Sequence, residues 1–91
     1  MEWTWDPRKA ATNLADHGVL FETALLVFDD PHLISGPDPH PDDDRWQVIG
    51  MVNLTTLFVV HTAVDDDGIG RIISARRATR GERKRYAKNF H

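Results

Sequence analysis

A chain of 91 residues that contains no cysteine fits one compact domain, which cannot draw on disulfides or thiolate metal ligands for its stability. Its first residues do not form a signal peptide, and no apolar run approaches the roughly 18 residues of a membrane helix, so we expect a cytoplasmic protein without a membrane partner. The net charge of −3 is unevenly placed, because eight of the eleven basic residues but only one of the fourteen acidic residues lie from Arg71 onwards.

A first helix is predicted close to the beginning of the chain. Asp6 and Pro7 have the form of a helix N-cap followed by a proline at the first helical position, and Gly18 supplies a left-handed stop. On this helix Lys9 and Asn13 share one side because they are four residues apart. We expect that side to be exposed to solvent.

A second short helix and a long loop are predicted to follow. Apolar residues recur at helical spacing over residues 21–28, and this helix should end near residues 29–31, where two aspartates precede a proline. Residues 35–44 contain three prolines, one glycine and four aspartates. Such a composition predicts a surface loop.

Three consecutive strands are predicted after the loop. Residues 45–54, 57–64 and 69–77 are rich in Val, Ile, Phe and Trp, which favour strands, whereas residues 65–68 read Asp-Asp-Asp-Gly and predict a turn. Strands that follow one another through short turns pair in antiparallel orientation. We therefore expect an antiparallel β-meander.

The basic end of the chain is predicted to be a helix. Thr79 and Glu82 have the spacing of a capping box, which predicts a helix from Arg80 to about Asn89. The charge of this helix indicates a polyanion or an acidic partner, while pairing with the acidic remainder of the same chain is an equal alternative. Two helices, an antiparallel meander and a basic helix together predict a single α+β domain over residues 1–91.

Two groups of residues, taken together, resemble the BrnT toxin family. The first group includes Trp5-Asp6-Pro7, His17-Gly18-Val19 and Asp30-Pro31, and the second includes Arg45-Trp46, Arg71-Ile72-Ile73-Ser74-Ala75-Arg76, Glu82-Arg83 and Tyr86. Their order and spacing across nearly the whole chain are those of the family. Departures at Asp16, before the His-Gly pair, and at Asp44, before the Arg-Trp pair, concern local details such as antitoxin contacts.

The resemblance implies a RelE-like fold and the function of a toxin in a type II toxin–antitoxin system. Such a toxin is an endoribonuclease that cleaves RNA without a metal ion and thereby arrests translation. Its partners are the RNA substrate and a BrnA-type antitoxin, which neutralises it in a heteromeric complex and through which alone it would contact DNA. Two other interpretations stay open: a non-catalytic RNA- or ribosome-binding module, and a structural subunit of a protein complex.

Arginine is the residue type that dominates the candidate active site. In RNA cleavage without a metal, the 2′-hydroxyl attacks phosphorus and negative charge builds on phosphate oxygens, which a guanidinium can bind through two hydrogen bonds. Arg76 ends a predicted strand directly before a helix N-terminus, so we expect it to bind phosphate, with an ion pair to an acidic residue as an equal alternative. Arg83, in the first turns of that helix, is the second catalytic candidate.

His61 is the candidate general base. If residues 65–68 form the turn, His61 pairs with Ile72, and regular alternation then places it on the same face as Ser74 and Arg76. An unperturbed pKa of about 6.5 suits proton transfer near neutral pH. The favoured alternative is a partly buried histidine that is satisfied by a backbone carbonyl.

The remaining candidates are Tyr86 for catalysis and three arginines for RNA binding. Tyr86 can stack on a base or donate a hydrogen bond, although core packing together with Phe90 is the more common role of such a pair. Arg45 carries part of the family motif, and with Arg77 and Arg80 we expect it to bind the RNA backbone. No spacing of His, Asp or Glu predicts a metal site, and no cofactor is expected.

Overall fold

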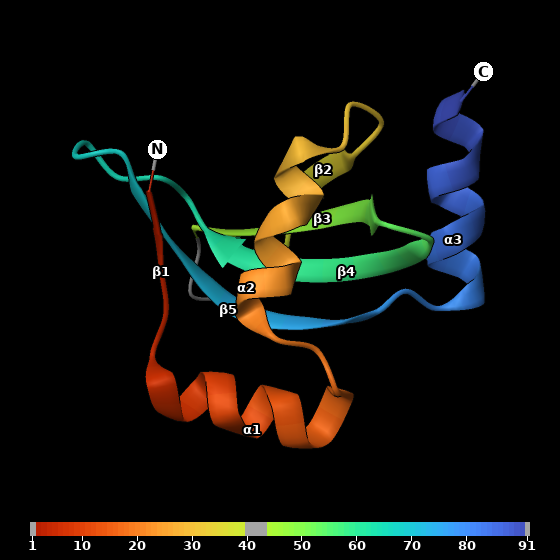
Figure 1. Cartoon of the computed structure of the whole chain (residues 1–91). Coiled ribbons are helices and arrows are strands. Elements are labelled where there is room, and N and C mark those ends of the chain that lie inside the picture. The colour runs from red at the N-terminus through yellow and green to blue at the C-terminus, as the bar shows by residue number, and fades with distance from the viewer. Residues whose placement is uncertain (1, 40–43, 91) are drawn as a thin grey trace.

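The computed structural model describes residues 2–39 and 44–90, which form an α+β fold around one sheet (Figure 1). The strands are β1 (Glu2–Thr4), β2 (Ile34–Pro37), β3 (Arg45–Val52), β4 (Thr55–Thr62) and β5 (Ile69–Arg77). The helices are α1 (Pro7–His17), α2 (Phe21–Ala24) with its 3₁₀ continuation η1 (Leu25–Asp29), and α3 (Arg80–Ala87) with the 3₁₀ turn η2 (Lys88–Phe90). None of the described helices is long and apolar enough to cross a membrane.

The sheet contains the predicted meander and two further strands at its edges. The strand order is β1-β5-β4-β3-β2, in which β3, β4 and β5 are consecutive and antiparallel, as predicted. β1 adds to β5 in parallel orientation, which makes the sheet mixed, and it is too short for an alternation pattern to reveal it. β2 pairs with β3 inside the segment that was predicted to be a loop, and Pro37 is tolerated there because the strand lies at an edge. Residues 40–43 of the predicted loop lie outside the described residues.

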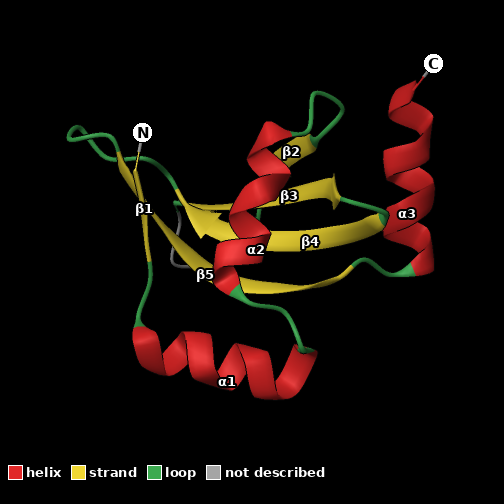
Figure 2. Ribbon diagram, viewed as in Figure 1, coloured by secondary structure: helices red, strands yellow, loops and turns green. Residues whose placement is uncertain are grey.

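Helices pack against both faces of the sheet (Figure 2). One face, named the α1/α2 face, has a core of Val19, Phe21, Ala24, Val27, Val48, Val52, Leu57, Val59, Ile72 and Ala75. The opposite face, named the α3 face, has a smaller core of Ile49, Phe58, Val60, Ala78 and Tyr86. Burial of these apolar side chains is the main favourable term in folding. α3 lies at one end of the sheet, so the β5–α3 junction is at the margin of the α3 face.

The predicted ends of α1 and the predicted start of α3 are confirmed. The Asp6 side chain accepts a hydrogen bond from the Arg8 amide at 2.8 Å, and Gly18 ends α1 with a φ of 68°. At the start of α3, the Glu82 amide donates to the Thr79 hydroxyl at 3.2 Å, and the Thr79 amide donates to the Glu82 carboxylate at 2.8 Å. These bonds satisfy backbone groups that lack partners inside a helix.

A β-bulge in β5 determines which side chains share a face. Val60 of β4 pairs with Ser74, but the next residue, His61, pairs with Ile72, so β5 holds one extra residue between these two pairs. The predicted pairing of His61 with Ile72 is confirmed. The prediction that His61 shares a face with Ser74 and Arg76 is wrong, because the extra residue reverses the alternation beyond it.

Asn13 of α1 ties this helix to the edge of β5. The Ala75 amide donates to Asn13 Oδ1 at 3.0 Å, and Asn13 Nδ2 donates to the carbonyl oxygens of Ala75 at 2.8 Å and Val19 at 3.0 Å. A carboxamide has the donor and acceptor of a peptide group, so this side chain takes the place of a neighbouring strand. Asn13 is only 6% exposed, so the prediction of an exposed position is wrong for this residue.

Replacement of Asn13 by alanine should destabilise the fold by about 2–4 kcal/mol, because it leaves buried amide and carbonyl groups without partners. Urea denaturation followed by circular dichroism measures the change. Thr12→Ala, at the exposed neighbouring position of α1, is the matched control and should cost no more than about 0.5 kcal/mol. Equal losses in the two variants would show that the Asn13 hydrogen bonds add nothing specific.

Candidate active site

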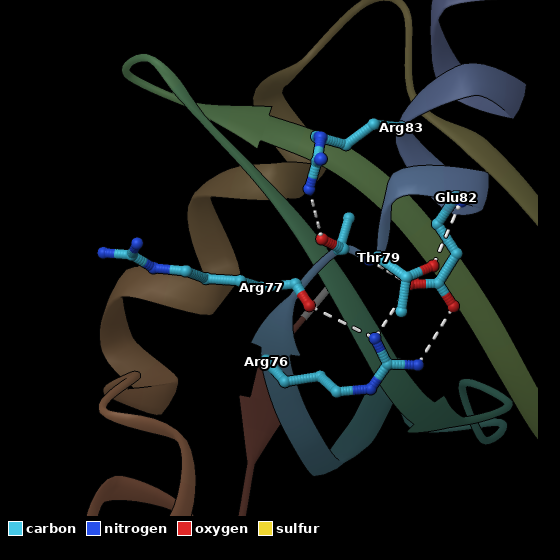
Figure 3. Close-up of polar contacts among 6 residues, drawn as sticks. Arg76, Arg77, Thr79, Glu82 and Arg83 are labelled. Atoms are coloured by element: carbon cyan, nitrogen blue, oxygen red, sulfur yellow. Dashed lines mark hydrogen bonds and ion pairs between the residues drawn. The ribbon is translucent and has the colours of Figure 1, made fainter.

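An arginine and a carboxylate meet at the junction of β5 and α3. Arg76 lies near the end of β5 opposite Phe58, on the α3 face, and Glu82 lies in the first turn of α3. The guanidinium donates from Nη1 to Glu82 Oε1 at 2.8 Å and from Nη2 to Oε2 at 3.0 Å, as Figure 3 shows. The side chains of Arg76 and Glu82 are 34% and 15% exposed, so solvent reaches both.

The Arg76–Glu82 pair is held from several sides. The Arg76 guanidinium carbon lies 4.2 Å from the centre of the Phe58 ring, and Nη1 also donates to the Arg77 carbonyl at 3.2 Å. The hydrogen bonds from Arg76 hold the pKa of Glu82 below its usual value although partial burial opposes them, and the same bonds raise the pKa of Arg76. At neutral pH both groups are therefore charged.

A ligand would still find donors at this junction. Three hydrogen bonds engage Arg76 within the described structure, while a guanidinium has five N–H groups, so two remain. Arg83 is exposed and donates from Nη1 to the Ala78 carbonyl at 2.9 Å. Arg76 and Arg83 thus bond to the carbonyls of successive residues, 77 and 78, and both cations lie beside the β5–α3 junction (Figure 3).

The three predicted RNA-binding arginines lie in different places. Arg80 is exposed at the start of α3, close to the junction. Arg77 points away from Arg76 in Figure 3 and lines a groove beside α2. Arg45 of β3 shares the α3 face with Arg76 of β5, because both strands pair with β4 in a known register. It lines a groove of about 540 Å³ at the opposite end of β5, and Arg71 lines the same groove.

Among residues 2–39 and 44–90, no cluster of three or more His, Asp or Glu side chains is placed to hold a metal ion.

His61 lies on the α1/α2 face and not with Arg76. It is 8% exposed, and its ring packs edge-on against Trp3 and Phe28, with centroid distances of 5.0 and 5.4 Å. Its Nδ1 lies 2.7 Å from the Thr62 carbonyl oxygen. Burial lowers the pKa of His61, partly offset by this hydrogen bond. The alternative expectation, a buried histidine bonded to a backbone carbonyl, is confirmed.

Tyr86 joins α3 to the rest of the molecule. It is 3% exposed within the core of the α3 face, and its hydroxyl donates to Asp30 Oδ2. Asp30 Oδ2 also accepts from the Met51 amide at 2.8 Å, and Oδ1 accepts from the His32 amide at 2.9 Å. Burial, together with the hydrogen bond to Asp30, raises the pKa of Tyr86 to about 12. Asp30 therefore anchors α3, β3 and the segment after η1.

Two of the polar residues that organise this region were not recognised as such in the sequence. Apart from their places in the motifs of the family resemblance, the sequence predicts only a capping role for Glu82 and a helix end at Asp30. The signal for Glu82 was present, because a capping box that begins two residues after a strand brings its carboxylate back towards the end of that strand. Asp30 offered no comparable signal, since Tyr86 is 56 residues away along the chain.

Comparisons with known proteins agree with this architecture. A family model described as the ribonuclease toxin BrnT of a type II toxin–antitoxin system matches residues 5–82, a range that includes both Arg76 and Glu82. Among solved structures, a 1.1 Å crystal structure of the Brucella abortus ribonuclease toxin BrnT is similar, with a TM-score of 0.66 and 28% sequence identity. That match covers 88% of this chain and 99% of the other. No significant match was found among curated proteins.

Replacement of Tyr86 by phenylalanine should lower the free energy of unfolding at pH 7 by about 1–2 kcal/mol, because the Asp30 carboxylate loses a donor. Burial raises the pKa of Asp30, but its hydrogen bonds outweigh this and hold the pKa below the usual value. The stabilisation by the ionised Asp30 carboxylate is thus present above the pKa of Asp in the unfolded chain, about 3.9. It is lost as the pH falls through the lower pKa of Asp30 in the folded protein.

Urea denaturation at pH 7 and at successively lower pH measures this effect. The difference between wild type and Tyr86→Phe should shrink as Asp30 becomes protonated. Asn89→Ala is the control, because it removes an exposed hydrogen bond to the His32 carbonyl that involves no titrating group. A difference for Tyr86→Phe that does not change with pH would contradict the assigned role of Asp30.

Proposed function

Because the chain belongs to the BrnT family of ribonuclease toxins of type II toxin–antitoxin systems, we propose that it is an endoribonuclease that arrests translation by cleaving RNA without a metal ion. The observation that carries this proposal is the position of Arg76, beside Arg83, on solvent-accessible surface at the β5–α3 junction. The similarity to the Brucella ribonuclease toxin at 28% identity supports it. The proposed site of action is the cytoplasm.

The proposed chemistry is an attack of the ribose 2′-hydroxyl on the adjacent phosphorus. Negative charge then develops on the non-bridging phosphate oxygens. The two unused N–H groups of Arg76 and those of Arg83 bind these oxygens, and because existing hydrogen bonds hold both guanidinium groups, little reorganisation is needed as the charge grows. Preorganised donors of this kind contribute about 10²–10³-fold in rate each.

The other arginines extend the proposed RNA-binding surface to different degrees. Arg80 lies at the start of α3 and can bind a phosphate close to the cleaved bond. Arg45 lies on the α3 face at the far end of the sheet, where it would bind a phosphate further along the RNA chain. Arg77 points away from this face, so its expected contribution is to the general positive potential.

An antitoxin partner follows from the type of system. The proposal is a BrnA-type antitoxin that covers the β5–α3 junction and competes with RNA in a heteromeric complex, with DNA contacted only through the antitoxin. Complementary charge would favour an acidic or amphipathic segment over residues 71–90, where the basic side chains are concentrated.

Arg76→Ala should abolish toxicity and RNA degradation when the chain is expressed alone in a bacterial host. With purified protein, cleavage should fall by about 10²–10³-fold, while RNA affinity should fall by about tenfold or less, since one phosphate contact is lost. As the control, Arg85→Ala removes an exposed arginine from α3 and should cleave like wild type. Proportional losses of binding and cleavage would favour a non-catalytic RNA-binding module, and a wild type that neither binds nor cleaves RNA would favour a structural subunit.

His61→Gln should affect stability more than catalysis. We expect the variant to lose about 1–3 kcal/mol of unfolding free energy, because it removes a buried ring that packs edge-on against two aromatic side chains. Below its melting temperature, cleavage should stay within about threefold of wild type, because His61 lies on the face opposite Arg76. Thermal unfolding and initial rates test this, with the exposed His17→Gln as control, and a rate loss like that of Arg76→Ala would return His61 to the active site.

A further inference from the structure

We propose that Glu82 is the general base that removes the proton from the attacking 2′-hydroxyl group. The inference rests on the proposed ribonuclease function and names a residue for a step that this function requires. It assigns to Glu82 a chemical role in addition to its position in the capping box of α3.

The geometry of the reaction requires the base and the phosphate-binding cation to be neighbours. The 2′-oxygen forms its new bond to the same phosphorus whose oxygens the cation binds, so both groups must act within a few ångströms of each other. The Glu82 carboxylate lies 2.8 and 3.0 Å from the two terminal nitrogens of Arg76. Within the described residues, no other carboxylate forms an ion pair with an arginine.

The other candidate bases are engaged elsewhere. His61 lies buried on the α1/α2 face, against Trp3 and Phe28. Tyr86 is buried, donates its hydroxyl hydrogen to Asp30, and has a pKa raised to about 12 by burial and by that contact. Asp30 itself accepts hydrogen bonds from three donors beneath α3.

Glu82 has the charge state and a free lone pair for this role. The Arg76 guanidinium keeps the pKa of Glu82 below its usual value, so the carboxylate is ionised at neutral pH. Oε1 accepts from Arg76 and from the Thr79 amide, whereas Oε2 accepts one hydrogen bond, from Arg76. Because a carboxylate oxygen accepts two hydrogen bonds, Oε2 retains a position for the 2′-hydroxyl, and solvent reaches the side chain.

Water carries a proton in this step and is regenerated at its end. Glu82 Oε2 takes the proton of the 2′-hydroxyl while the O2′–P bond forms, and the P–O5′ bond breaks. The leaving O5′ takes a proton from water, and the resulting hydroxide is neutralised by the proton that Glu82 then releases. The products are a 2′,3′-cyclic phosphate and a 5′-hydroxyl. Arg76 holds the phosphate oxygens throughout and transfers no proton.

The test separates a base from a residue that only caps α3 and positions Arg76. Glu82→Gln keeps the size of the side chain and an oxygen that can accept from Thr79, but it cannot take a proton. We expect kcat to fall by about 10²–10³-fold, with the RNA dissociation constant within about threefold of wild type. In wild type, kcat/KM should fall as the pH drops through the pKa of Glu82, and this acidic limb should be missing in Glu82→Gln. Glu22→Gln, at an exposed position of α2, is the matched control and should behave like wild type.

A second variant guards against an effect of folding. In Glu82→Ala, added formate should restore cleavage in proportion to the concentration of the formate anion, whereas chloride at the same concentration should not. Cleavage by Glu82→Gln within about threefold of wild type would overturn the proposal. A second combination of results would also overturn it: Glu82→Gln cleaves slowly but keeps the acidic limb, and formate does not rescue Glu82→Ala. Glu82 would then only position Arg76. Failure of the proposed function is distinguishable, because wild type would then not cleave RNA, or Arg76→Ala would cleave like wild type.

Discussion

One extra residue in β5 determines how the polar groups of this molecule are distributed. Before the bulge, Ile72 and its partner His61 face α1 and α2; after it, Ser74 and Arg76 face the side on which α3 packs. Without the bulge, regular alternation would direct Arg76 into the larger apolar core, where an unpaired guanidinium is costly to bury. The bulge therefore places this arginine at a margin that solvent can reach, and it leaves His61 among aromatic rings.

Buried polar side chains then lock the layers around the bulged strand. Asn13 bonds to both peptide groups of Ala75, between the bulge and Arg76, so α1 holds the segment of β5 that carries the arginine. On the other face, Asp30 holds α3 through Tyr86 and β3 through Met51. In the folded protein, Asn13 and Asp30 form directed hydrogen bonds with groups that bind water in the unfolded chain. These bonds make the arrangement specific as well as stable. No buried polar side-chain atom in the described residues lacks a partner.

The Arg76–Glu82 pair serves both folding and the proposed chemistry. Glu82 closes the capping box of α3 with Thr79, and its ion pair with Arg76 joins that helix to β5. As a chemical element the pair places a fixed cation and an ionised carboxylate side by side on accessible surface. One such partly exposed ion pair contributes modestly to the free energy of folding. The fold therefore depends more on the two apolar cores than on this pair.

The sequence by itself determined the features that depend on residues close together in the chain. The caps of α1 and α3 each involve residues at most four positions apart, and the strands of the meander follow from composition and short turns. Only the tertiary structure decided which residues meet across the fold: Asn13 with Ala75, 62 positions apart, and Tyr86 with Asp30, 56 positions apart. It also decided the face of His61 relative to Arg76. A bulge shifts the register of a strand by one residue without a local sequence pattern that predicts it, and the register determines the face of every side chain beyond it.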